Sequence, residues 1–301
     1  MLVFSKITNI LLMYVIVELF AMATNISQLQ ISLTIIKEAP MNKSILFFDI
    51  DGTILSEKTH VISEDTKEAI EAARKNGHLA FINTGRTLEE LDHRILSLEF
   101  DGYVCGCGTY IMHNDQVLLN KLLTKECMES VLMDIKGCRL EACLEGITTV
   151  YFDSNSTNTR ICELRESMKN RNINLGTFDD ENIEFTKLTI WIQNDSDYKT
   201  FYQRQKDTFT FIDRGNQFFE IVPKGFSKAT GIQFLLNYFD LSLADAYAFG
   251  DSTNDLPMLE YVTNSVAMGN SDPSLFSLVS FVTKDVEDNG IRHALEHYKL
   301  I

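Results

Sequence analysis

The sequence is poor in basic residues. It carries 27 lysines and arginines against 42 aspartates and glutamates, which gives its 301 residues a formal net charge of −15. Binding to a nucleic-acid backbone depends on clustered Lys and Arg, so this imbalance argues against a nucleic-acid partner. It does not exclude a small anionic substrate, because one metal ion and a few well-placed cations can make a single pocket positive.

The sequence also lacks the cysteine spacing of a metal site or a disulfide framework. Its six cysteines include no CxxC pair, and a chain of this length with 45% hydrophobic residues can bury a core without disulfides. The cysteines therefore indicate reduced thiols in a cytosolic protein. Cys105 and Cys107 with His113 do not make the usual zinc-ligand set, so we interpret this stretch as an ordinary strand.

The N-terminus has only a short apolar run. This run, Ile10 to Val17, is ended by Glu18 and falls short of the roughly 20 apolar residues that a membrane-spanning helix needs. We therefore expect no stable membrane partner beyond what a signal-like segment would provide.

Two interpretations of residues 1–40 are open. Ala21-Met22-Ala23 resembles a signal-peptide cleavage site, which would export the protein or anchor it through residues 1–23. Alternatively, Met41 opens the folded part, and residues 1–40 are an over-extended start or a loose N-terminal helix. Signal-like patterns are easily met by chance, so we favour the second interpretation and expect a cytoplasmic protein.

After residue 40, strand and helix patterns alternate. "ILFFDI", residues 45–50, is a continuous apolar run typical of a strand buried on both faces of a parallel sheet. Residues 63–77 follow as a helix, with Ser63 as N-cap and Gly77 at its end, and "HLAFINTG" is a second strand. Strand, helix and strand in this order predict a βαβ unit, and hence an α/β fold with a doubly wound parallel sheet.

The middle of the chain has a different pattern. From residue 87 to residue 222, short alternating strands and amphipathic helices predict an inserted α+β module. From Pro223 the strand–helix rhythm resumes. We therefore predict one core domain in two pieces, residues 41–86 and 223–301, with the α+β domain between them and residues 1–40 as an extension.

Two carboxylates stand at the end of the first predicted strand. In open α/β sheets the site lies beyond the carboxyl ends of the strands. Asp49 and Asp51 occupy such an end, and Gly52 lets the chain turn sharply there. Two carboxylates this close do not readily both ionise, so one pKa is expected to rise unless a cation intervenes. The pair suits a nucleophile beside a general acid/base; an Asx-rich turn is the alternative.

Two further elements offer groups that bind anions. Thr84 ends the second strand, and Gly85 exposes backbone N–H groups. Ser227 is a plausible N-cap, so Lys228 falls in the first turn of a helix, where a cation is unfavourable against the helix dipole. A lysine at that position either meets an anion or is a solvated surface residue, and both interpretations stay open.

The fourth element is "FGDSTNDLPML". Asp251 follows an apolar run, and Asn254 and Asp255 lie in the next turn. Acidic groups at this strand end, facing Asp49 and Asp51 across the sheet, would make an all-oxygen site suited to Mg²⁺. Helix capping by Ser252 or Asp255 is the alternative, and it can coexist with metal binding.

Together and in this order, the four elements resemble the haloacid dehalogenase superfamily, and in detail its Cof-type sugar-phosphatase branch. The resemblance covers residues 43–301, including the closing "FVTKDVEDNGIRHAL". It implies a Rossmann-like doubly wound parallel-sheet core with an α+β cap domain inserted between the second and third motifs. The break in pattern at residues 87–222 agrees with such a cap.

The resemblance also implies catalytic roles. Asp49 would attack phosphorus and become an aspartyl phosphate. Asp51 would protonate the leaving alcohol and then deprotonate the water that hydrolyses the intermediate. Lys228, rather than the earlier Lys224, would neutralise charge on the nucleophile and the phosphate.

The remaining roles concern binding. Thr84 and the Gly85 N–H would hold the phosphoryl oxygens. The implied Mg²⁺ ligands are Asp49, the backbone carbonyl of Asp51, and Asp251. The implied supporting residues are Asn254, Asp255 and Arg86, of which Arg86 would order the junction of core and cap.

One position departs from the family pattern. Cys107 stands where relatives commonly carry an asparagine, in the stretch "CGCGTY" that we expect to be the first cap strand. No substrate contact is inferred from it. Trp191 is interpreted as cap core, and no role is assigned to the cap cations Arg139, Arg160 and Arg165.

Three functions compete. The first is a Mg²⁺-dependent phosphatase acting on a small phosphorylated metabolite, such as a sugar phosphate. The second is a phosphomutase on the same core, which would have to keep the phosphoryl group from water. The third is a non-catalytic regulator that binds a phosphorylated metabolite, against which the complete set of acidic residues argues.

Overall fold

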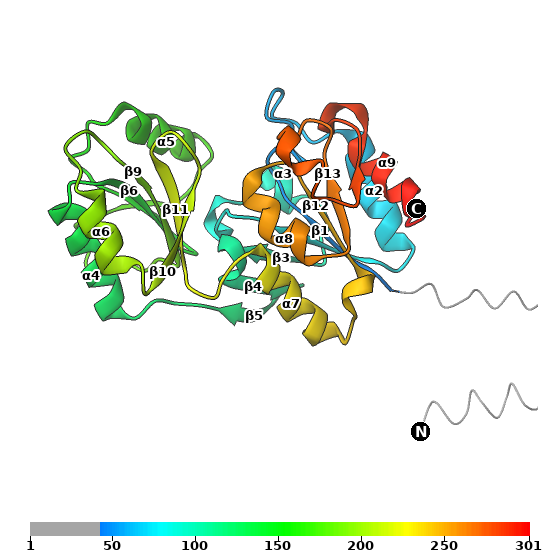
Figure 1. The fold of residues 1–301 in the computed structure, drawn as a ribbon, viewed down its shortest axis with the longest axis horizontal. Helices are drawn as coiled ribbons and strands as arrows, with labels where there is room; N and C mark the ends of the chain where they lie inside the picture. Colours follow the sequence, from blue (N-terminus) through cyan, green and yellow to red (C-terminus); the bar gives the residue numbers. More distant parts are fainter. Residues whose placement is uncertain (1–42) are drawn as a thin grey trace, which may run out of the picture. The chain divides into compact units, whose positions relative to one another are not determined.

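A computed structural model describes residues 43–301 (Figure 1). Within them the strands form an eight-stranded sheet, here the core sheet, and a six-stranded sheet, here the cap sheet. The predicted N-terminal extension and its signal-like segment lie outside the described residues. In residues 43–301, no helix is long and apolar enough to cross a membrane.

The strand that leads to Asp49 lies in the interior of the core sheet. Its strands in spatial order are β14 (Phe281–Val282), β13 (Asn264–Ala267), β12 (Ala246–Gly250), β1 (Ile45–Phe48), β2 (Leu79–Asn83), β3 (Gly102–Cys105), β4 (Tyr110–His113) and β5 (Gln116–Asn120). Pairing is parallel from β14 to β3, which confirms the predicted doubly wound parallel core. The chain leaves β1 towards β2 on one side and returns with β12 on the other. The ends of β1 and β12 are therefore the switch point at which such sheets bind ligands.

Helices cover both faces of the core sheet. On one face α2 (Glu64–Lys75) and α9 (Gly290–His297) pack against Leu46 and Phe48. On the other, α7 (Lys228–Phe239) and α8 (Leu256–Tyr261) pack against Ile45 and Phe47. Neighbouring residues of a strand point to opposite faces, so an uninterrupted apolar run is needed to fill both.

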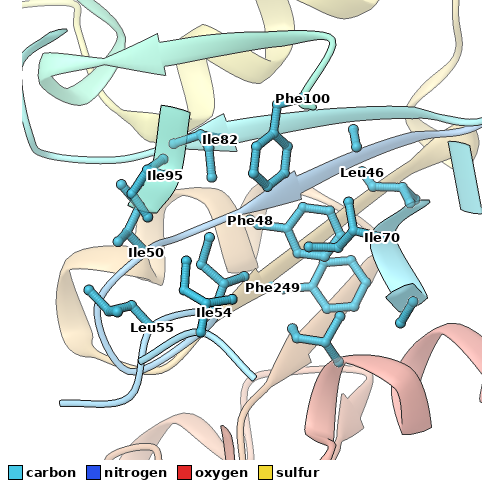
Figure 2. Close-up of a cluster of buried hydrophobic side chains, with 14 of the residues drawn as sticks. Leu46, Phe48, Ile50, Ile54, Leu55, Ile70, Ile82, Ile95, Phe100 and Phe249 are labelled. Carbon is cyan, nitrogen blue, oxygen red and sulfur yellow. The ribbon is translucent and has the colours of Figure 1, made fainter. Parts of the chain in front are cut away.

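Stacked aromatic rings anchor the strand that carries Asp49. The ring of Phe48 lies 4.6 Å from that of Phe249 on β12, and both side chains are fully buried (Figure 2). Burying one such ring stabilises the fold by about 1.5–3 kcal/mol. The residues that follow the two strands, Asp49 and Asp251, therefore start from fixed positions.

Two predicted N-caps are confirmed. The Ser63 side chain accepts a hydrogen bond from the Thr66 N–H at the start of α2. The Ser227 side chain does the same for the Thr230 N–H at the start of α7, so Lys228 is the first residue of that helix.

The sheet pairing corrects the expected extent of the inserted module. β3 pairs in parallel with β2, and β4 and β5 continue the core sheet as an antiparallel hairpin. The stretch 102–120, including "CGCGTY", therefore belongs to the core sheet, and its assignment to the cap is wrong. Short strands joined by tight turns look alike in sequence whichever sheet they join, because pairing is decided by partners elsewhere in the chain.

The cap sheet is mixed, as expected for an α+β module. Its strands in spatial order are β10 (Phe209–Asp213), β11 (Phe218–Pro223), β9 (Lys187–Trp191), β6 (Glu141–Glu145), β7 (Val150–Phe152) and β8 (Leu175–Thr177). The helices α4 (Lys125–Gly137) and α6 (Tyr198–Gln205) pack on one face, with Leu188 and Ile190 beneath them. The other face packs partly against α5 (Thr159–Asn170), and it carries the alternate residues of β9.

Candidate active site

A buried lysine joins two of the predicted site residues. The Lys228 ammonium lies 2.6 Å from the Asp49 Oδ1 and 2.5 Å from the Asp255 Oδ1. Lys228 is 1% exposed and Asp49 4%. Burial alone would lower the pKa of Lys228, but Asp255 and Asp49 outweigh it and raise the pKa above its usual range. The interpretation of Lys228 as a solvated surface residue is thereby excluded.

Asp255 has both carboxylate oxygens engaged. One accepts from Lys228, and the other accepts from the backbone N–H groups of Asp251 and Ser252, at 2.9 and 3.1 Å. A Cβ on Gly250 would lie 2.6 Å from the Asp255 side chain. Asp255 therefore links the turn after β12 to Lys228. Only glycine fits at position 250, because a side chain there would clash with Asp255.

Three carboxylates crowd the switch point. Asp49, Asp251 and Asp255 each offer an oxygen within 4.8 Å of the others. Burial first, and then the charge of Asp255, raise the pKa of Asp49 to about 7 and the pKa of Asp251 to about 8. The sequence predicted such a rise from the nearness of Asp51 to Asp49, but Asp51 contributes less than burial and Asp255 do.

The crowded carboxylates suit a hard divalent cation. Both Asp255 oxygens already accept hydrogen bonds, so Asp49 and Asp251 are the freer candidate ligands of the three. Gly52 has a φ of +75°, and a Cβ on it would lie 2.2 Å from the Asp251 Oδ2. The turn predicted at Gly52 therefore also makes room for the Asp251 carboxylate. All-oxygen donor sets of this kind bind Mg²⁺.

Asp51 is paired with Arg86. The Arg86 Nε donates to one Asp51 carboxylate oxygen at 3.0 Å and Nη2 to the other at 2.5 Å, while Nη1 donates to the Glu90 carbonyl at 3.4 Å. The Asp51 side chain is 44% exposed. Arg86 thus lies beside the predicted acid/base, and its side-chain hydrogen bonds in residues 43–301 are to core residues. The Asp51 carboxylate does not belong to the cluster of Asp49, Asp251 and Asp255. The metal contact predicted for Asp51 is through its backbone carbonyl.

The loop after β2, residues 84–86, offers free donors. The Thr84 backbone is tied to the neighbouring loop, since its N–H donates to Val104 and its carbonyl accepts from Cys107. The Thr84 Oγ1 accepts from the Arg86 N–H at 3.2 Å, which leaves its own hydrogen to donate. Within residues 43–301 the Gly85 N–H makes no hydrogen bond. Donors left unpaired in this way suit an anion.

Cys107 shapes this loop from the core side. Its φ is +55°, a left-handed conformation in which asparagine is several-fold enriched. Burial raises the pKa of the Cys107 thiol far above its usual range, which disfavours the nucleophilic thiolate.

A cavity of about 370 Å³ lies over these groups. The predicted site residues that line it are Asp49, Asp51, Thr84, Gly85, Arg86, Asp251 and Asn254. Lys228 and Asp255 do not line it and support it from behind. The residues of the cap sheet and α5 that line it are Cys143, Glu145, Leu164, Met168, Lys187, Thr189, Trp191, Arg214, Phe218 and Glu220.

The cap residues of this cavity were not predicted from the sequence. Arg139, Arg160 and Arg165 had no role assigned, and the cap cations that line the cavity are Lys187 and Arg214. The available signal was the alternation in "KLTIWIQ", which places Lys187 on the same face as Trp191. Trp191 packs in the cap core as expected, and it also lines the cavity, stacked on Phe218 at 4.8 Å.

Comparison with known proteins places this site in context. Residues 46–295 match the family described as haloacid dehalogenase-like hydrolase. YkrA of Bacillus subtilis (strain 168) is 28% identical over 270 residues, which cover 87% of this chain and 100% of YkrA. The 5-amino-6-(5-phospho-D-ribitylamino)uracil phosphatase YitU of the same organism is 26% identical over 276 residues, covering 84% and 97%. Among solved structures, the subclass IIB sugar phosphatase BT4131 matches with a TM-score of 0.74 and 26% identity, covering 86% and 100%.

Proposed function

Because the chain belongs to the haloacid dehalogenase-like hydrolases and is a phosphatase, we propose that it hydrolyses a small sugar phosphate or a similar phosphomonoester through an aspartyl phosphate on Asp49. The observation that carries this proposal is the buried Lys228 ammonium, 2.6 Å from an Asp49 carboxylate that lines the cavity. The names of YitU and BT4131 support a small phosphorylated metabolite as the substrate.

In the first half-reaction, an Asp49 carboxylate oxygen forms a bond to phosphorus while the bond from phosphorus to the ester oxygen breaks. A protonated Asp51 carboxyl donates its proton to the leaving oxygen, so a neutral alcohol departs. The Thr84 hydroxyl and the Gly85 N–H donate to phosphoryl oxygens, and Lys228 offsets negative charge at Asp49. Positioning and charge compensation are the main demands of phosphoryl transfer.

In the second half-reaction, Asp51 is a carboxylate and takes a proton from water. The water oxygen bonds to phosphorus, the bond from phosphorus to Asp49 breaks, and inorganic phosphate leaves. The bidentate pairing with Arg86 holds the Asp51 carboxylate beside the cavity. This position supports the proposed proton transfers to the leaving oxygen and from the water.

The metal that we propose is Mg²⁺. Asp49 and Asp251 would hold it together with the Asp51 backbone carbonyl, while Asn254 and Asp255 support the site. When bound, it would neutralise charge that develops on the phosphoryl oxygens. The excess of buried carboxylates over cations at this point fits that role.

Residues on the cap side of the cavity are placed to contact the leaving group. Trp191 and Phe218 present a stacked aromatic wall. One Arg214 guanidinium nitrogen is buried, and within residues 43–301 it has no hydrogen-bond partner. We propose that Arg214 pairs with a polar or anionic group of the leaving alcohol, because a buried donor without a partner is unfavourable.

The proposal is tested by measuring phosphate release from a panel of phosphorylated sugars, nucleotides and cofactors, with Mg²⁺ and with EDTA. We expect release that requires Mg²⁺ and is fastest with a small phosphomonoester. Isomerised sugar phosphate without released phosphate would favour a phosphomutase instead. Undiminished release in EDTA would contradict the proposed metal dependence.

Protons are expected to compete with Mg²⁺ at this site. The pKa values of about 7 for Asp49 and about 8 for Asp251 lie above the ordinary 3.8. Their contribution to stability is therefore present at low pH and is lost as the pH rises through 7 and 8. In EDTA the melting temperature should fall between about pH 6 and about pH 9 from this contribution. Added Mg²⁺ should raise the melting temperature more at the higher pH, where both carboxylates are ionised.

Thermal unfolding with and without Mg²⁺ across this range is the measurement. Asp251→Asn is the matched variant, and it should flatten the pH dependence in EDTA and weaken Mg²⁺ stabilisation. A Mg²⁺ effect of constant size from low to high pH would contradict the assignment of these two carboxylates as ligands.

A further inference from the structure

Lys187 of the cap sheet has all three of its ammonium hydrogens engaged. Its Nζ lies 2.7 Å from the Glu145 Oε2, 2.7 Å from the Glu220 Oε1 and 2.9 Å from the Gly85 carbonyl oxygen. The first two partners are on β6 and β11 of the same sheet, but Gly85 is in the loop after β2 of the core sheet. Lys187 is 3% exposed. One buried cation therefore ties the cap sheet to the loop that offers donors to an anion.

The contact of Lys187 with Gly85 is linked to the Thr84 hydroxyl through one peptide group. The Gly85 carbonyl and the Arg86 N–H belong to the same planar peptide group. The Arg86 N–H donates to the Thr84 Oγ1 at 3.2 Å. When Lys187 fixes the direction of the carbonyl, it also fixes the N–H that occupies a lone pair of Thr84. The Thr84 hydrogen is then left for an anion.

Glu220 approaches the same loop closely. A Cβ on Gly85 would lie 2.9 Å from the Glu220 Oε1, and the Cys107 thiol donates to that oxygen at 3.4 Å. The loop is therefore held from the cap side by the hydrogen bond of Lys187 to Gly85, and from the core side by the hydrogen bond of Cys107 N–H to Thr84. Glu220 leaves no room for a side chain at position 85.

Two other roles for Lys187 fit less well. It is not a direct anion ligand, because its three donors are already used. It is also not explained as a stabilising ion pair, since buried ion clusters are often no more stable than an apolar replacement. The contact that no apolar residue could replace is the one to Gly85.

We propose that Lys187 is a positioning residue by which the cap holds the 84–86 loop in its anion-binding geometry. This inference rests on the proposed function. Phosphoryl transfer then depends on the cap sheet being seated on the core, because the carbonyl of the Gly85–Arg86 peptide is bound by a residue from the other sheet. A misplacement of about 1 Å at a reacting group can cost about 100-fold in rate.

The test compares variants that share the same disturbed ion cluster. Lys187→Met alone would leave Glu145 and Glu220 without a cation and could prevent folding. We therefore pair Lys187→Met with Glu220→Gln and compare this double variant with Glu220→Gln alone, which keeps the Lys187 contact to Gly85. In the double variant Glu145 can take a proton, because burial raises its pKa to about 8.

We expect catalytic efficiency and phosphate affinity to fall only in the variant that lacks the Lys187 contact to Gly85. Relative to Glu220→Gln, the double variant should lose about 30- to 100-fold in kcat/KM and about 10-fold in affinity for inorganic phosphate as competitive inhibitor. Mg²⁺ affinity should stay the same. Asp134→Asn breaks another cap ion pair, at 2.6 Å from Arg204 and away from the cavity. It should lower the melting temperature without changing either constant.

Equal kcat/KM and equal phosphate affinity in Glu220→Gln and the double variant would overturn the inference while leaving the proposed function in place. If the wild-type protein hydrolyses nothing in the panel, the proposed function fails. Thermal stabilisation by inorganic phosphate then still reports on the loop. Its loss in the double variant alone would support positioning by Lys187. The inference would be overturned if inorganic phosphate stabilised both variants equally, or if it did not stabilise the wild type.

Discussion

Asp49→Asn is expected to lower kcat by about 10⁴-fold or more. An amide is a far weaker nucleophile than a carboxylate, so the phosphorus–oxygen bond to residue 49 does not form. The Asn side chain keeps an oxygen for Lys228, which lies 2.6 Å from the Asp49 Oδ1. The variant should therefore fold, and with saturating Mg²⁺ the loss should fall on kcat rather than on KM.

The same substitution should not destabilise the metal-free protein at alkaline pH. The pKa of Asp49 is raised to about 7, so above that pH the wild-type fold holds an unfavourable buried charge that asparagine lacks. In EDTA at about pH 8.5, the melting temperature of Asp49→Asn should equal or exceed that of the wild type.

Asp115→Asn, at an exposed turn between β4 and β5, is the matched control and should leave both quantities unchanged. Phosphate release and thermal unfolding of the three proteins are the measurements. Activity of Asp49→Asn within about 10-fold of the wild type would exclude Asp49 as the nucleophile.

Lys228→Met is expected to destabilise the fold by about 3–5 kcal/mol and to remove activity. The lysine is 1% exposed and is the cation shared by Asp49 and Asp255. Without it, two buried carboxylates must either stay charged without a partner or take up protons. Protonation relieves the cost, so the loss of stability should be smaller at about pH 5.5 than at about pH 8.5.

Chemical denaturation at the two pH values measures this effect. Lys224→Met is the matched control, because this exposed lysine lies four residues earlier and its ion pair with Asp207 is long, at 3.9 Å. It should change stability by less than about 0.5 kcal/mol. Equal stability of Lys228→Met and the wild type at the higher pH would show that the ammonium does not hold these carboxylates.

The sequence predicted those parts of the molecule that depend on neighbouring residues in the chain. The run "ILFFDI" indicated a strand buried on both faces, and Phe48 and Phe47 do pack on opposite sides of the core sheet. The caps Ser63 and Ser227 were readable because an N-cap bonds to a residue three positions on. Each such feature spans only a few residues.

Features that depend on distant partners were predicted less well. Residues 102–120 were assigned to the cap but pair with β2, because strand pairing is not encoded in the strand alone. Arg86 was expected to order the core–cap junction, and its bidentate pairing with Asp51 was not predicted from the sequence. The rise of the Asp49 pKa was expected from Asp51, yet burial and Asp255 contribute most.

The sequence by itself thus determined which residues stand at the ends of strands, and the order of the four motifs along the chain. Only the tertiary structure decided that Lys228 lies between Asp49 and Asp255, and that Lys187 reaches from the cap sheet to Gly85. The physical reason is range. Capping, turns and strand periodicity act over a few residues, whereas an ion pair in a buried site joins residues brought together by packing of the whole fold.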